Sequence, residues 1–411
     1  MELRAVTDRI ISQALKDSQP DGAVRRALTG REFGGRVYLV AIGKAAWAMA
    51  KTAYDVLGTR ITDGIVVTKY HHCAGEIGRL KIFEAGHPVP DENTVLATNA
   101  VVEMVSGLEQ NDTVLFLVSG GGSALFEQPL IPLEEMADVT RQLLASGAGI
   151  MEMNAVRKRL SGVKGGRFAA LCAPARVFSV VLSDIIGDPL DMIASGPAYP
   201  DSSTCEQVAQ IVKKYDLVLS DQAAALLRQE TPKKLDNVET VITGSVSQLC
   251  ASAERVCREL GFEPHVLTAS LCCCAREAGS FLASIAQCHR NTPRPLAFIA
   301  GGETVVHLTG TGLGGRNQEL ALAAAAGLAG IPNAALFSVG SDGTDGPTDA
   351  AGGYADGQTL SRLRKNGVDY DAEMENNNSY YALKACDGLI VTGPTGTNVN
   401  DLTVLLLNPQ E

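Results

Sequence analysis

A glycine-rich turn at residues 119–123 is the first segment whose residue types suggest ligand chemistry. Ser119, Gly120, Gly121, Gly122 and Ser123 directly follow the apolar run VLFLV. Successive glycines allow several backbone N–H groups to point toward one place, and a helix that begins there adds its positive end. The turn is therefore a candidate nest for the phosphates of a nucleotide or for a carboxylate, with a plain tight turn as the structural alternative.

Two further turns place cations beside glycines. The segment LSGVKGGRFAA contains Lys164, Gly165 and Gly166, which we expect to bind phosphate, although a solvated surface turn would have the same composition. Lys44 lies in AIGKAAWAMA, at an expected turn from strand to helix, where the positive helix end does not stabilise a lysine. A bound anion would remove this conflict, so we expect Lys44 to stabilise phosphate charge unless its side chain turns into water.

Carboxylates are concentrated in the segment VLSDIIGDPLDMIASGPAYPD, which carries Asp184, Asp188 and Asp191. Mg²⁺ prefers oxygen ligands and commonly bridges a protein carboxylate and substrate phosphates. We expect Asp184 and Asp188 to bind the metal, while Asp188 could instead accept the proton of an attacking hydroxyl group. The structural alternative is that these aspartates only form turns.

In the second half of the chain, GGETVVHLTGTGLGGRNQELA joins an apolar run, a glycine loop and an alanine-rich helix. Arg316 and Asn317 lie at the expected helix start, and Glu303 lies in the GGET turn. A planar guanidinium group can hold a carboxylate or a transferring phosphoryl group through two hydrogen bonds. Arg316 is therefore the strongest catalytic candidate, and Asn317 and Glu303 are expected to bind substrate. Glu303 could alternatively form a structural ion pair.

The same loop matches the dinucleotide-binding pattern GxGxxG through Gly310, Gly312 and Gly315. Asp342 ends the next expected strand, 27 residues beyond Gly315, which is farther than the usual ribose contact. Nicotinamide binding is therefore the weaker interpretation of the loop. Asp342 also belongs to the carboxylate-rich segment SVGSDGTDGPTDAAGG, where we expect it to contact substrate.

The elements that position these residues follow one pattern, in which short apolar runs end at Gly or Ser and helical stretches separate them. Examples are residues 37–42, 113–118 and 177–182. Runs with little polar alternation are typical of a parallel sheet that helices cover on both faces. We therefore expect an α/β fold whose first lobe is a Rossmann-like, doubly wound, mostly parallel sheet, with ligands at the carboxyl ends of its strands.

The 411 residues exceed the usual size of one hydrophobic core, so we expect two domains. The polar stretch QETPKKLDN precedes a new apolar run, which predicts domains at residues 1–237 and 238–411 with a cleft between them. The second domain is expected to be smaller and also α/β. It ends in two expected strands, residues 388–392 and 402–407, which could pair at a sheet edge.

The acidic balance of the chain argues against several classes of partner. There are 46 Asp and Glu against 35 Lys and Arg, a formal charge of -11, which opposes binding to nucleic acid or anionic membranes. Small-molecule partners are favoured. No stretch of apolar residues is long enough to span a bilayer, so the cytoplasm is the expected location, and the sequence is compatible with a homo-oligomer.

Several familiar sequence patterns are absent. No Walker A, HRD or DFG pattern occurs, which excludes P-loop and protein-kinase sites. The ten cysteines include no CxxC pair and predict neither a zinc site nor a disulfide framework. His71, His72 and His87 have no Ser or Cys partner at a recognisable spacing, so we interpret them as ordinary polar or buried residues.

Eight motifs follow one another along about residues 5–407. They are AIGKAAWAMA, HPVPDENT, VSGGGSAL, NAVRKRLSGVKGGR, SDIIGDPLDMIASGP, GGETVVHLTGTGLGGRNQELALA, SVGSDGTDGPTDAAGG and TGPTGTNVNDL. In this order they closely resemble the glycerate 2-kinase family, whose C-terminal half is called the MOFRL domain. A set of ordered motifs is far more specific than any single glycine loop.

The resemblance implies transfer of the γ-phosphoryl group of ATP to the 2-hydroxyl of D-glycerate, which gives 2-phosphoglycerate and ADP, with a divalent metal such as Mg²⁺. It places the lysine of the GKA turn at Lys44 and the arginine of the GGRNQE motif at Arg316. Arg159 stands where the family pattern has His, and an arginine cannot exchange a proton near neutral pH. Some family members are labelled hydroxypyruvate reductases, so an NAD(P)H-dependent hydroxypyruvate reductase is the alternative function.

Overall fold

The structure, a computed structural model, describes residues 2–409, and these residues form two compact units. The first unit comprises Ala23–Thr243, and the second comprises residues 2–22 together with residues 244–409. The chain therefore passes between the units twice, after residue 22 and after residue 243.

Helix α1 (Leu3–Asp17) explains most of the difference between this division and the expected domains 1–237 and 238–411. One face of α1 is buried, and α1 packs against α11 (Val246–Glu259) in the second unit. Strand β6 (Val238–Gly244), by contrast, is the edge strand of the first sheet. An amphipathic pattern predicts that a helix buries one face, but it does not say which part of the molecule covers that face.

The first unit contains a six-stranded sheet in the order β3-β2-β1-β4-β5-β6. The pairs β1–β2, β1–β4, β2–β3 and β4–β5 are parallel. This is the strand order of dinucleotide-binding α/β folds, so the expected Rossmann-like sheet is confirmed. Apart from β6, its strands are β1 (Val37–Ile42), β2 (Ile61–Lys69), β3 (Lys81–Ala85), β4 (Thr113–Val118) and β5 (Arg176–Leu182).

Burial explains why the apolar runs form the interior of this sheet. Strand β4 reads TVLFLV, and all six of its residues are buried, as expected for a central parallel strand between two helical layers. The strand order reverses between β1 and β4, so the turns that follow these strands lie next to each other at the carboxyl edge. The sheet therefore brings Lys44, after β1, to the glycine turn at residues 119–123, after β4.

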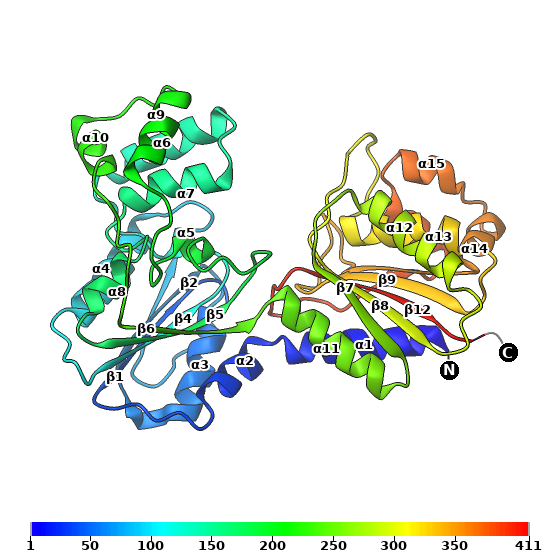
Figure 1. Cartoon of the computed structure of the whole chain (residues 1–411), viewed down its shortest axis with the longest axis horizontal. Coiled ribbons are helices and arrows are strands. Elements are labelled where there is room, and N and C mark those ends of the chain that lie inside the picture. The colour runs from blue at the N-terminus through cyan, green and yellow to red at the C-terminus, as the bar shows by residue number, and fades with distance from the viewer. Residues whose placement is uncertain (1, 410–411) are drawn as a thin grey trace. The chain divides into compact units, whose positions relative to one another are not determined.

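Helices cover both faces of the first sheet (Figure 1). Helix α3 contacts β1, β2 and β4 on one face, while α4 and α8 contact each other on the opposite face. The helices between residues 20 and 227 are α2 (Pro20–Leu28), α3 (Ala46–Leu57), α4 (Glu92–Val105), α5 (Gly122–Leu125), α6 (Leu133–Ala145), α7 (Ile150–Arg159), α8 (Arg167–Cys172), α9 (Cys205–Lys214) and α10 (Asp221–Leu227), with short 3-10 turns at Gly58–Arg60 and Ile193–Ser195.

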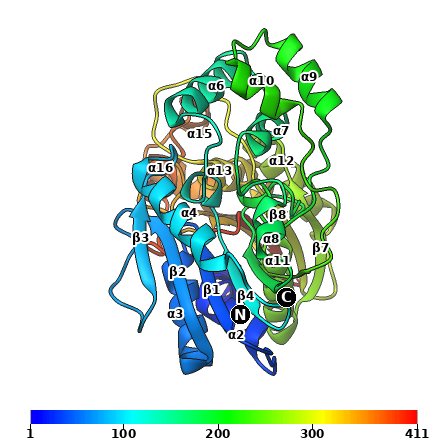
Figure 2. The ribbon, with the colours of Figure 1, turned by 90° about the vertical axis from the view of Figure 1, so that its left-hand side faces the viewer.

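Four helices of the first unit form a separate layer beyond the strand ends (Figure 2). Helices α6 and α7 lie in the connection from β4 to β5, and α9 and α10 lie in the connection from β5 to β6. Their buried side chains, among them Val139, Leu143, Val156, Val208 and Leu227, form a core of their own. The two connections that build this layer therefore also carry the candidate segments around Lys164 and Asp188.

The second unit contains a mixed six-stranded sheet in the order β11-β10-β9-β12-β8-β7. The pair β7–β8 is parallel, and the pairs β8–β12, β12–β9, β9–β10 and β10–β11 are antiparallel. Its strands are β7 (Glu263–Leu271), β8 (Leu296–Gly302), β9 (Ala334–Gly340), β10 (Gly352–Asp356), β11 (Leu389–Ile390) and β12 (Asp401–Leu407).

The last two strands do not pair with each other. Strand β11 lies at the sheet edge, but β12 lies in the interior between β8 and β9. All seven residues of β12 are buried, because the run DLTVLLL is covered on both faces. Helices α12 and α13 contact each other on one face of the sheet, and α1 and α11 pack on the other (Figure 1). The remaining helices are α12 (Ala275–Cys288), α13 (Arg316–Leu328), α14 (Thr359–Lys365), α15 (Tyr370–Glu375) and α16 (Ser379–Ala385).

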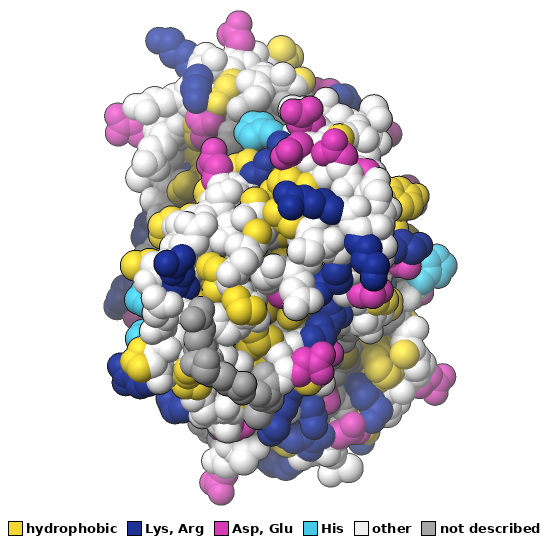
Figure 3. Space-filling view, turned by 90° about the vertical axis from the view of Figure 1, so that its right-hand side faces the viewer, with side chains coloured by type: hydrophobic (Ala, Val, Ile, Leu, Met, Phe, Trp, Pro, Cys, Tyr) yellow, Lys and Arg dark blue, Asp and Glu magenta, His cyan; other side chains and the backbone are white. Residues whose placement is uncertain are grey.

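On the face shown in Figure 3, basic side chains lie among acidic ones. Among residues 2–409, no helix has both the length and the apolar content needed to cross a bilayer. All ten cysteines are free thiols.

Candidate active site

The turns after β1 and β4 are joined by backbone hydrogen bonds. The N–H of Lys44 donates to the carbonyl oxygen of Gly120 (2.9 Å), and the N–H of Ala45 donates to Oγ of Ser119 (3.1 Å). Gly43 has φ +113, and a Cβ added there would lie 2.3 Å from Oγ of Ser119, so only glycine fits. The structure thus brings Lys44 and the glycine turn together, as expected.

The glycine turn presents backbone donors. Gly121 adopts the left-handed conformation (φ +84) at the start of α5. Within the described part of the chain, the N–H groups of Gly121 and Ser123 have no hydrogen-bond acceptor. A Cβ on Gly120 would lie 2.3 Å from Oδ2 of Asp184, so this carboxylate rests directly against the turn. The N–H groups can bind an anion, and the carboxylate beside them can bind a cation that accompanies this anion.

His87 lies beside the glycine turn, a position that the sequence interpretation did not predict. A Cβ added to Gly121 would lie 3.0 Å from Cδ2 of His87 and 3.3 Å from Cγ of Lys44, so both side chains flank the turn. Burial, together with the positive charges of Lys44, Lys69 and His72, lowers the pKa of His87 below its usual value. The available signal was the motif HPVPDENT, but its spacing to other residues gave no chemical role.

The aspartate segment that follows β5 lies beside this turn, and several of its residues have strained backbone conformations. Asp188, Ala194 and Ser195 all have positive φ values (51, 51 and 60). Oδ1 of Asp188 is buried and has no hydrogen-bond partner in the described structure, so it is an acceptor without a donor. The carboxylate of Asp191 already has partners within the protein: it lies 3.5 Å from Nζ of Lys158 and accepts a hydrogen bond from Ser202 (2.8 Å).

A short polar chain connects the glycine turn to helix α7. Oγ of Ser123 and Oγ of Ser195 are 3.0 Å apart, and Ser195 donates to Oδ1 of Asn154 (2.9 Å). Ser195 and Asn154 are buried. The direction of the Ser123 hydroxyl is therefore set by Ser195, in the motif IASGP, and through it by Asn154, in the motif NAVRKRLS.

The structure places Lys164, Gly165 and Gly166 away from any open anion site. Lys164 is fully buried, donates to the carbonyl oxygen of Phe126 (2.7 Å) and pairs with Glu127 (3.0 Å). Burial lowers the pKa of Lys164 to about 8. The N–H groups of the two glycines donate to the carbonyl oxygens of Ser195 and Gly196 (3.1 and 2.8 Å). This loop supports the turn at residues 195–196 instead of offering donors to phosphate.

Arg159 is also an interior residue. Its side chain is fully buried, pairs with Glu230 (3.0 Å) and Asp201 (3.5 Å), and donates to Oγ of Ser203 (2.8 Å). The charge that replaces the family's histidine is therefore compensated inside the protein.

In the second unit, Arg316 begins helix α13 and lies among carboxylates. Its Nε is 2.5 Å from Oδ2 and its Nη2 is 3.0 Å from Oδ1 of Asp401, while Nη1 is 3.1 Å from Oε1 of Glu303. Burial lowers the pKa of Arg316, but the bonds to Asp401 raise it above its usual value overall. The side chain of Arg316 is 35% exposed, so the guanidinium is held in place yet still open to a ligand.

Asn317, expected to bind substrate, is instead buried and 1% exposed. Its Oδ1 accepts from Ser338 (2.6 Å), and its backbone N–H donates to Oδ1 of Asp345 (3.1 Å). Asp345 also accepts from the N–H of Gln318 (2.8 Å), so it caps the start of α13. Burial raises the pKa of Asp345 to about 6. These residues orient the helix on which Arg316 lies.

Asp342 lies in the turn that follows β9, near the Arg316 cluster. A Cβ added to Gly340 would lie 3.4 Å from Oδ1 of Asp342 and 3.5 Å from Oδ1 of Asp401. Oδ1 of Asp342 accepts from the backbone N–H and the hydroxyl of Thr344 (2.9 and 3.1 Å), which fixes the turn. The structure therefore brings Glu303, Arg316, Asp342 and Asp401 to one edge of the second sheet.

In the glycine loop before Arg316, three consecutive asparagines occupy the backbone donors of residues 309–313. Oδ1 of Asn377 accepts from the N–H groups of Thr309 and Gly310 (2.7 and 2.9 Å). The N–H groups of residues 311, 312 and 313 donate to Asn376 or Asn378 at 2.8–3.0 Å. A dinucleotide loop needs free donors for the pyrophosphate, so this geometry argues against the nicotinamide interpretation.

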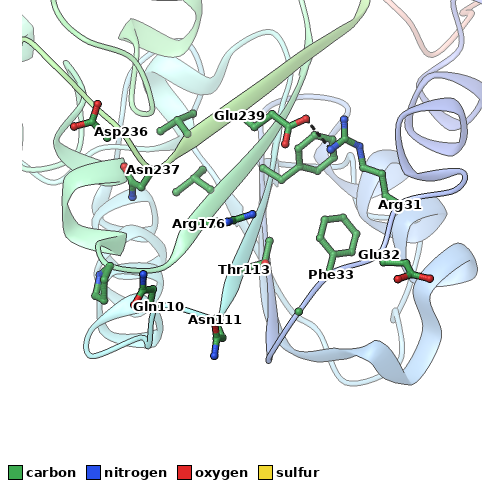
Figure 4. A pocket seen from close by; sticks show the side chains of 15 residues that line it. Arg31, Glu32, Phe33, Gln110, Asn111, Thr113, Arg176, Asp236, Asn237 and Glu239 are labelled. Atoms are coloured by element: carbon green, nitrogen blue, oxygen red, sulfur yellow. Dashed lines mark ion pairs between the residues drawn. The ribbon is translucent and has the colours of Figure 1, made fainter.

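A cavity of about 690 Å³ lies elsewhere, at the amino ends of β4, β5 and β6 (Figure 4). The guanidinium of Arg31 lies 4.0 Å from the ring centre of Phe178 and pairs with Glu239 (2.7 Å). In α/β sheets, ligands of the reaction bind at the carboxyl ends of the strands, so this cavity is separate from the residues above.

Comparison with known proteins agrees with these features. A family model described as a domain of unknown function (DUF4147) matches residues 6–228, and the model of the MOFRL family matches residues 296–401. The D-glycerate 2-kinase of Thermotoga maritima is 53% identical, with 98% of each chain covered. The glycerate 2-kinase of Pyrococcus horikoshii is 39% identical, with 99% of this chain and 98% of the relative covered. A protein of Agrobacterium vitis with a provisional name as a hydroxypyruvate reductase is 40% identical, with 91% of this chain and 100% of the relative covered.

Solved structures give the same result. The crystal structure of a Thermotoga maritima glycerate kinase superposes with a TM-score of 0.95 at 52% identity, covering 98% of this chain and 99% of the other. A Pyrococcus horikoshii protein superposes with a TM-score of 0.94 at 38% identity, covering 100% and 99%. Because one family model matches more than half of the chain and relatives of this identity span nearly all of it, the chain belongs to the glycerate 2-kinase family.

Proposed function

We propose that this protein is an ATP-dependent kinase that phosphorylates the 2-hydroxyl of D-glycerate and releases 2-phosphoglycerate and ADP. D-glycerate and ATP are its small-molecule partners, and we place the reaction in the cytoplasm, where ATP is available. The observation that carries the proposal is the junction of the β1 and β4 turns, where Lys44 and the N–H of Gly121 have no anionic partner among the described residues. Uncompensated donors and cations at a strand switch point suit the phosphates of a nucleotide.

In the first unit, the glycine turn and Lys44 would hold phosphate oxygens. Phosphoryl transfer involves charge on several oxygens, so its catalysis consists mainly of positioning and charge stabilisation. The oxygen of the 2-hydroxyl group attacks the γ-phosphorus, the bond from that phosphorus to the β,γ-bridging oxygen breaks, and ADP leaves with the bond electrons. The hydroxyl proton requires an acceptor, and Asp188 is the candidate because its buried Oδ1 has no donor in the described structure.

Mg²⁺ would accompany ATP, and the residues of the first unit are suited to it. Among residues 2–409, no group of three or more His, Cys, Asp or Glu side chains forms a preformed metal cage. Mg²⁺ does not need one, because it commonly uses one or two carboxylates together with substrate phosphates and water. Asp184, which lies against Gly120, would supply one carboxylate ligand, and Asp188 would supply a second only where its Oδ1 does not serve as the proton acceptor. The bound metal would neutralise phosphate charge.

In the second unit, Arg316 is proposed to stabilise anionic charge. Asp401 holds two of its nitrogens, so the guanidinium plane is preorganised, while the half-exposed Glu303 pairs with the third. Glu303 and Asp342 are proposed to accept hydrogen bonds from substrate hydroxyl groups. This division leaves Asn317 with a structural role, since its side chain faces Ser338 and Asp345.

One assay tests the proposal. Purified protein is incubated with D-glycerate, ATP and Mg²⁺, ADP is quantified, and ³¹P–¹H correlation NMR identifies the phosphorylated carbon. We expect ADP and 2-phosphoglycerate in equal amounts, with no ADP above background when D-glycerate is omitted. Hydroxypyruvate-dependent oxidation of NADH or NADPH without ATP turnover would establish the reductase alternative and contradict the kinase.

A further inference from the structure

His87 lies on the glycine turn with neither ring nitrogen engaged. A Cβ on Gly121 would lie 3.0 Å from Cδ2 and 3.1 Å from Nε2 of His87, so the imidazole edge that carries Nε2 faces the backbone of Gly121. Within residues 2–409, no hydrogen bond or ion pair of the His87 ring is found. The N–H of Gly121 is also without an acceptor. Two unused polar groups therefore lie side by side.

The surroundings of His87 are positively charged. Lys44 from the turn after β1, Lys69 from the end of β2 and His72 from the following loop all act on its ring. Within the described chain, Lys44 and Lys69 form no ion pair with an acidic side chain. The positive charges of Lys44 and Lys69 repel each other, so binding of an anion would stabilise this cluster, which has no counterion in the described chain.

The nearby acidic side chains are occupied with other partners. Glu84 on β3 accepts from the backbone N–H groups of His72 and Cys73 (3.1 and 3.0 Å). Asp91, which caps α4, accepts from Tyr70 (2.7 Å) and from the N–H of Thr94 (2.9 Å). Asp184 lies against Gly120 and belongs to the proposed metal ligands. None of these carboxylates forms an ion pair with Lys44 or Lys69 in the described structure, so an anion from outside the chain could approach the cluster.

We propose that His87 is a phosphate-binding residue, whose Nε2–H donates a hydrogen bond to the anion held by the N–H of Gly121 and by Lys44. The inference rests on the proposed function only in naming that anion as a phosphate group of ATP or ADP. Histidine suits this place because a neutral imidazole adds a donor without adding a further charge beside Lys44. Burial and the neighbouring cations keep the ring neutral near pH 7 because they lower its pKa.

Two amide substitutions test which ring nitrogen acts. In His87→Gln the side-chain amide reaches close to the position of Nε2, whereas in His87→Asn it takes the place of Nδ1. We expect His87→Asn to weaken the binding of ADP and of inorganic phosphate roughly 10-fold to 100-fold, the range of one hydrogen bond to a charged group. His87→Gln should retain affinity within about fivefold, since it keeps a donor at the same place. Isothermal titration calorimetry measures both probes.

The control is His289→Gln, because His289 lies in the second unit, caps α12 through its backbone and has an exposed ring whose aromatic contact is with Phe298. Its affinities should equal those of the parent protein. Thermal unfolding of all three variants identifies any loss of fold. Equal phosphate and ADP affinities in the parent, His87→Gln and His87→Asn proteins would overturn the proposal, as would equal weakening in both His87 variants with the fold intact.

An NMR titration supplies a readout that a merely structural role would not change. If the bound anion accepts from Nε2, its negative charge stabilises the imidazolium, so the pKa of His87 measured from its ¹³Cε1–¹H signal rises when phosphate is added. An unchanged His87 signal under saturating phosphate would contradict contact. This outcome is separable from the proposed function, because D-glycerate-dependent ADP formation with an unaltered KM for ATP in His87→Asn would leave the kinase in place and remove only His87.

Discussion

Asp401 holds Arg316 through two hydrogen bonds, from Nε to Oδ2 (2.5 Å) and from Nη2 to Oδ1 (3.0 Å), at the first residue of α13. The carboxylate fixes the plane of the guanidinium, and a fixed plane is what distinguishes arginine from lysine as an anion ligand. The side chain of Asp401 is only 7% exposed, so loss of Arg316 would leave a buried carboxylate without its ion-pair partner.

Arg316→Ala is therefore expected to lower kcat for D-glycerate phosphorylation by about 100-fold to 1,000-fold, the effect of removing one preorganised donor of transition-state charge. Arg316→Lys keeps the charge but not the two-pronged geometry, and should recover only a small part of the rate. Initial rates of ADP formation measure both variants, with Arg290→Ala as a surface control. Turnover of Arg316→Ala within a few-fold of the parent would remove this residue from the mechanism.

Lys164→Met tests whether this lysine supports the fold rather than the nucleotide. Glu127, its partner at 3.0 Å, is fully buried, so removing the lysine should lower the free energy of unfolding of the first unit by about 3–5 kcal/mol. Urea unfolding followed by the fluorescence of Trp47, the single tryptophan, measures the change. Adding Glu127→Gln should restore only part of the stability, because it removes the unpaired buried carboxylate but also takes away the partner of Arg157, which lies 3.8 Å from Glu127.

The double variant Lys164→Met with Glu127→Gln also distinguishes a structural role of Lys164 from a role in binding the phosphates of ATP. With a structural Lys164, the folded double variant should have a KM for ATP within about twofold of the parent, as expected for sites that do not touch ligand. An increase of more than about tenfold would place the ammonium group at the phosphates.

Sequence patterns located the candidate residues that follow strands, for a physical reason. Lys44 and the turn at residues 119–123 come after two apolar runs, and parallel strands deliver their carboxyl ends to one edge whatever the distance along the chain. Arg316 was found through its glycine loop in the same way. The order of the strands confirms that β1 and β4 are neighbours.

The misplaced residues share a different cause. Lys164 and Asn317 are polar, and their composition predicts exposure, but partners distant in sequence bury them: Glu127 pairs with the lysine, and Asp345 and Ser338 bond the asparagine. His87 was missed for the converse reason. Its ring reaches the glycine turn only because the loop after β3 folds across the turn after β4, and no local spacing encodes that approach.

Asn377 is predicted to determine the order of the glycine loop before Arg316. Its Oδ1 accepts from two backbone N–H groups, and its Nδ2 donates to the carbonyl oxygen of His307 and to Glu319 (both 3.0 Å). Asn377→Ala removes these bonds and should raise amide hydrogen exchange of residues 305–314 by about tenfold or more. Exposed Asn366→Ala is the control. Unchanged exchange in the loop would show that Asn376 and Asn378 suffice.

Asp112 should contribute stability to the first unit that depends on acid pH. Its hydrogen bonds with Arg36 (2.7 and 3.1 Å) hold its pKa at about 2, below the unfolded value of 3.8. A lowered carboxyl pKa stabilises the fold above the unfolded pKa, and this stabilisation is lost as pH falls from 3.8 toward 2. Because Arg36 is half-exposed, the contribution at pH 7 should be only about 1–2 kcal/mol.

Asp112→Asn should therefore unfold at lower urea than the parent at pH 7, with the difference shrinking as pH falls below 4 and vanishing near 2. Trp47 fluorescence reports this transition because the residue lies on α3 of the first unit. Asp138→Asn, at an exposed ion pair with Arg141, should show no comparable change. A difference that grew on acidification would contradict the sign of the linkage.

Asp345 should act on the second unit in the opposite direction. Burial raises its pKa to about 6, above the unfolded value of 3.8, so the folded state binds the proton more tightly and loses stability as pH rises from about 4 to 6. The difference in pKa corresponds to about 3 kcal/mol at neutral pH. Asp345→Asn cannot bind this proton. Between pH 4 and 7 its free energy of unfolding should therefore rise, relative to that of the parent, by up to this amount. A cost that does not depend on pH is added, because the variant loses an acceptor for an N–H group at the start of α13. Hydrogen exchange of α13 peptides, compared at equal intrinsic exchange rates across pH, measures the trend, with exposed Asp371→Asn as the control. A parent whose α13 protection rose with pH relative to Asp345→Asn would show that Asp345 is stabilised as the carboxylate by the helix start.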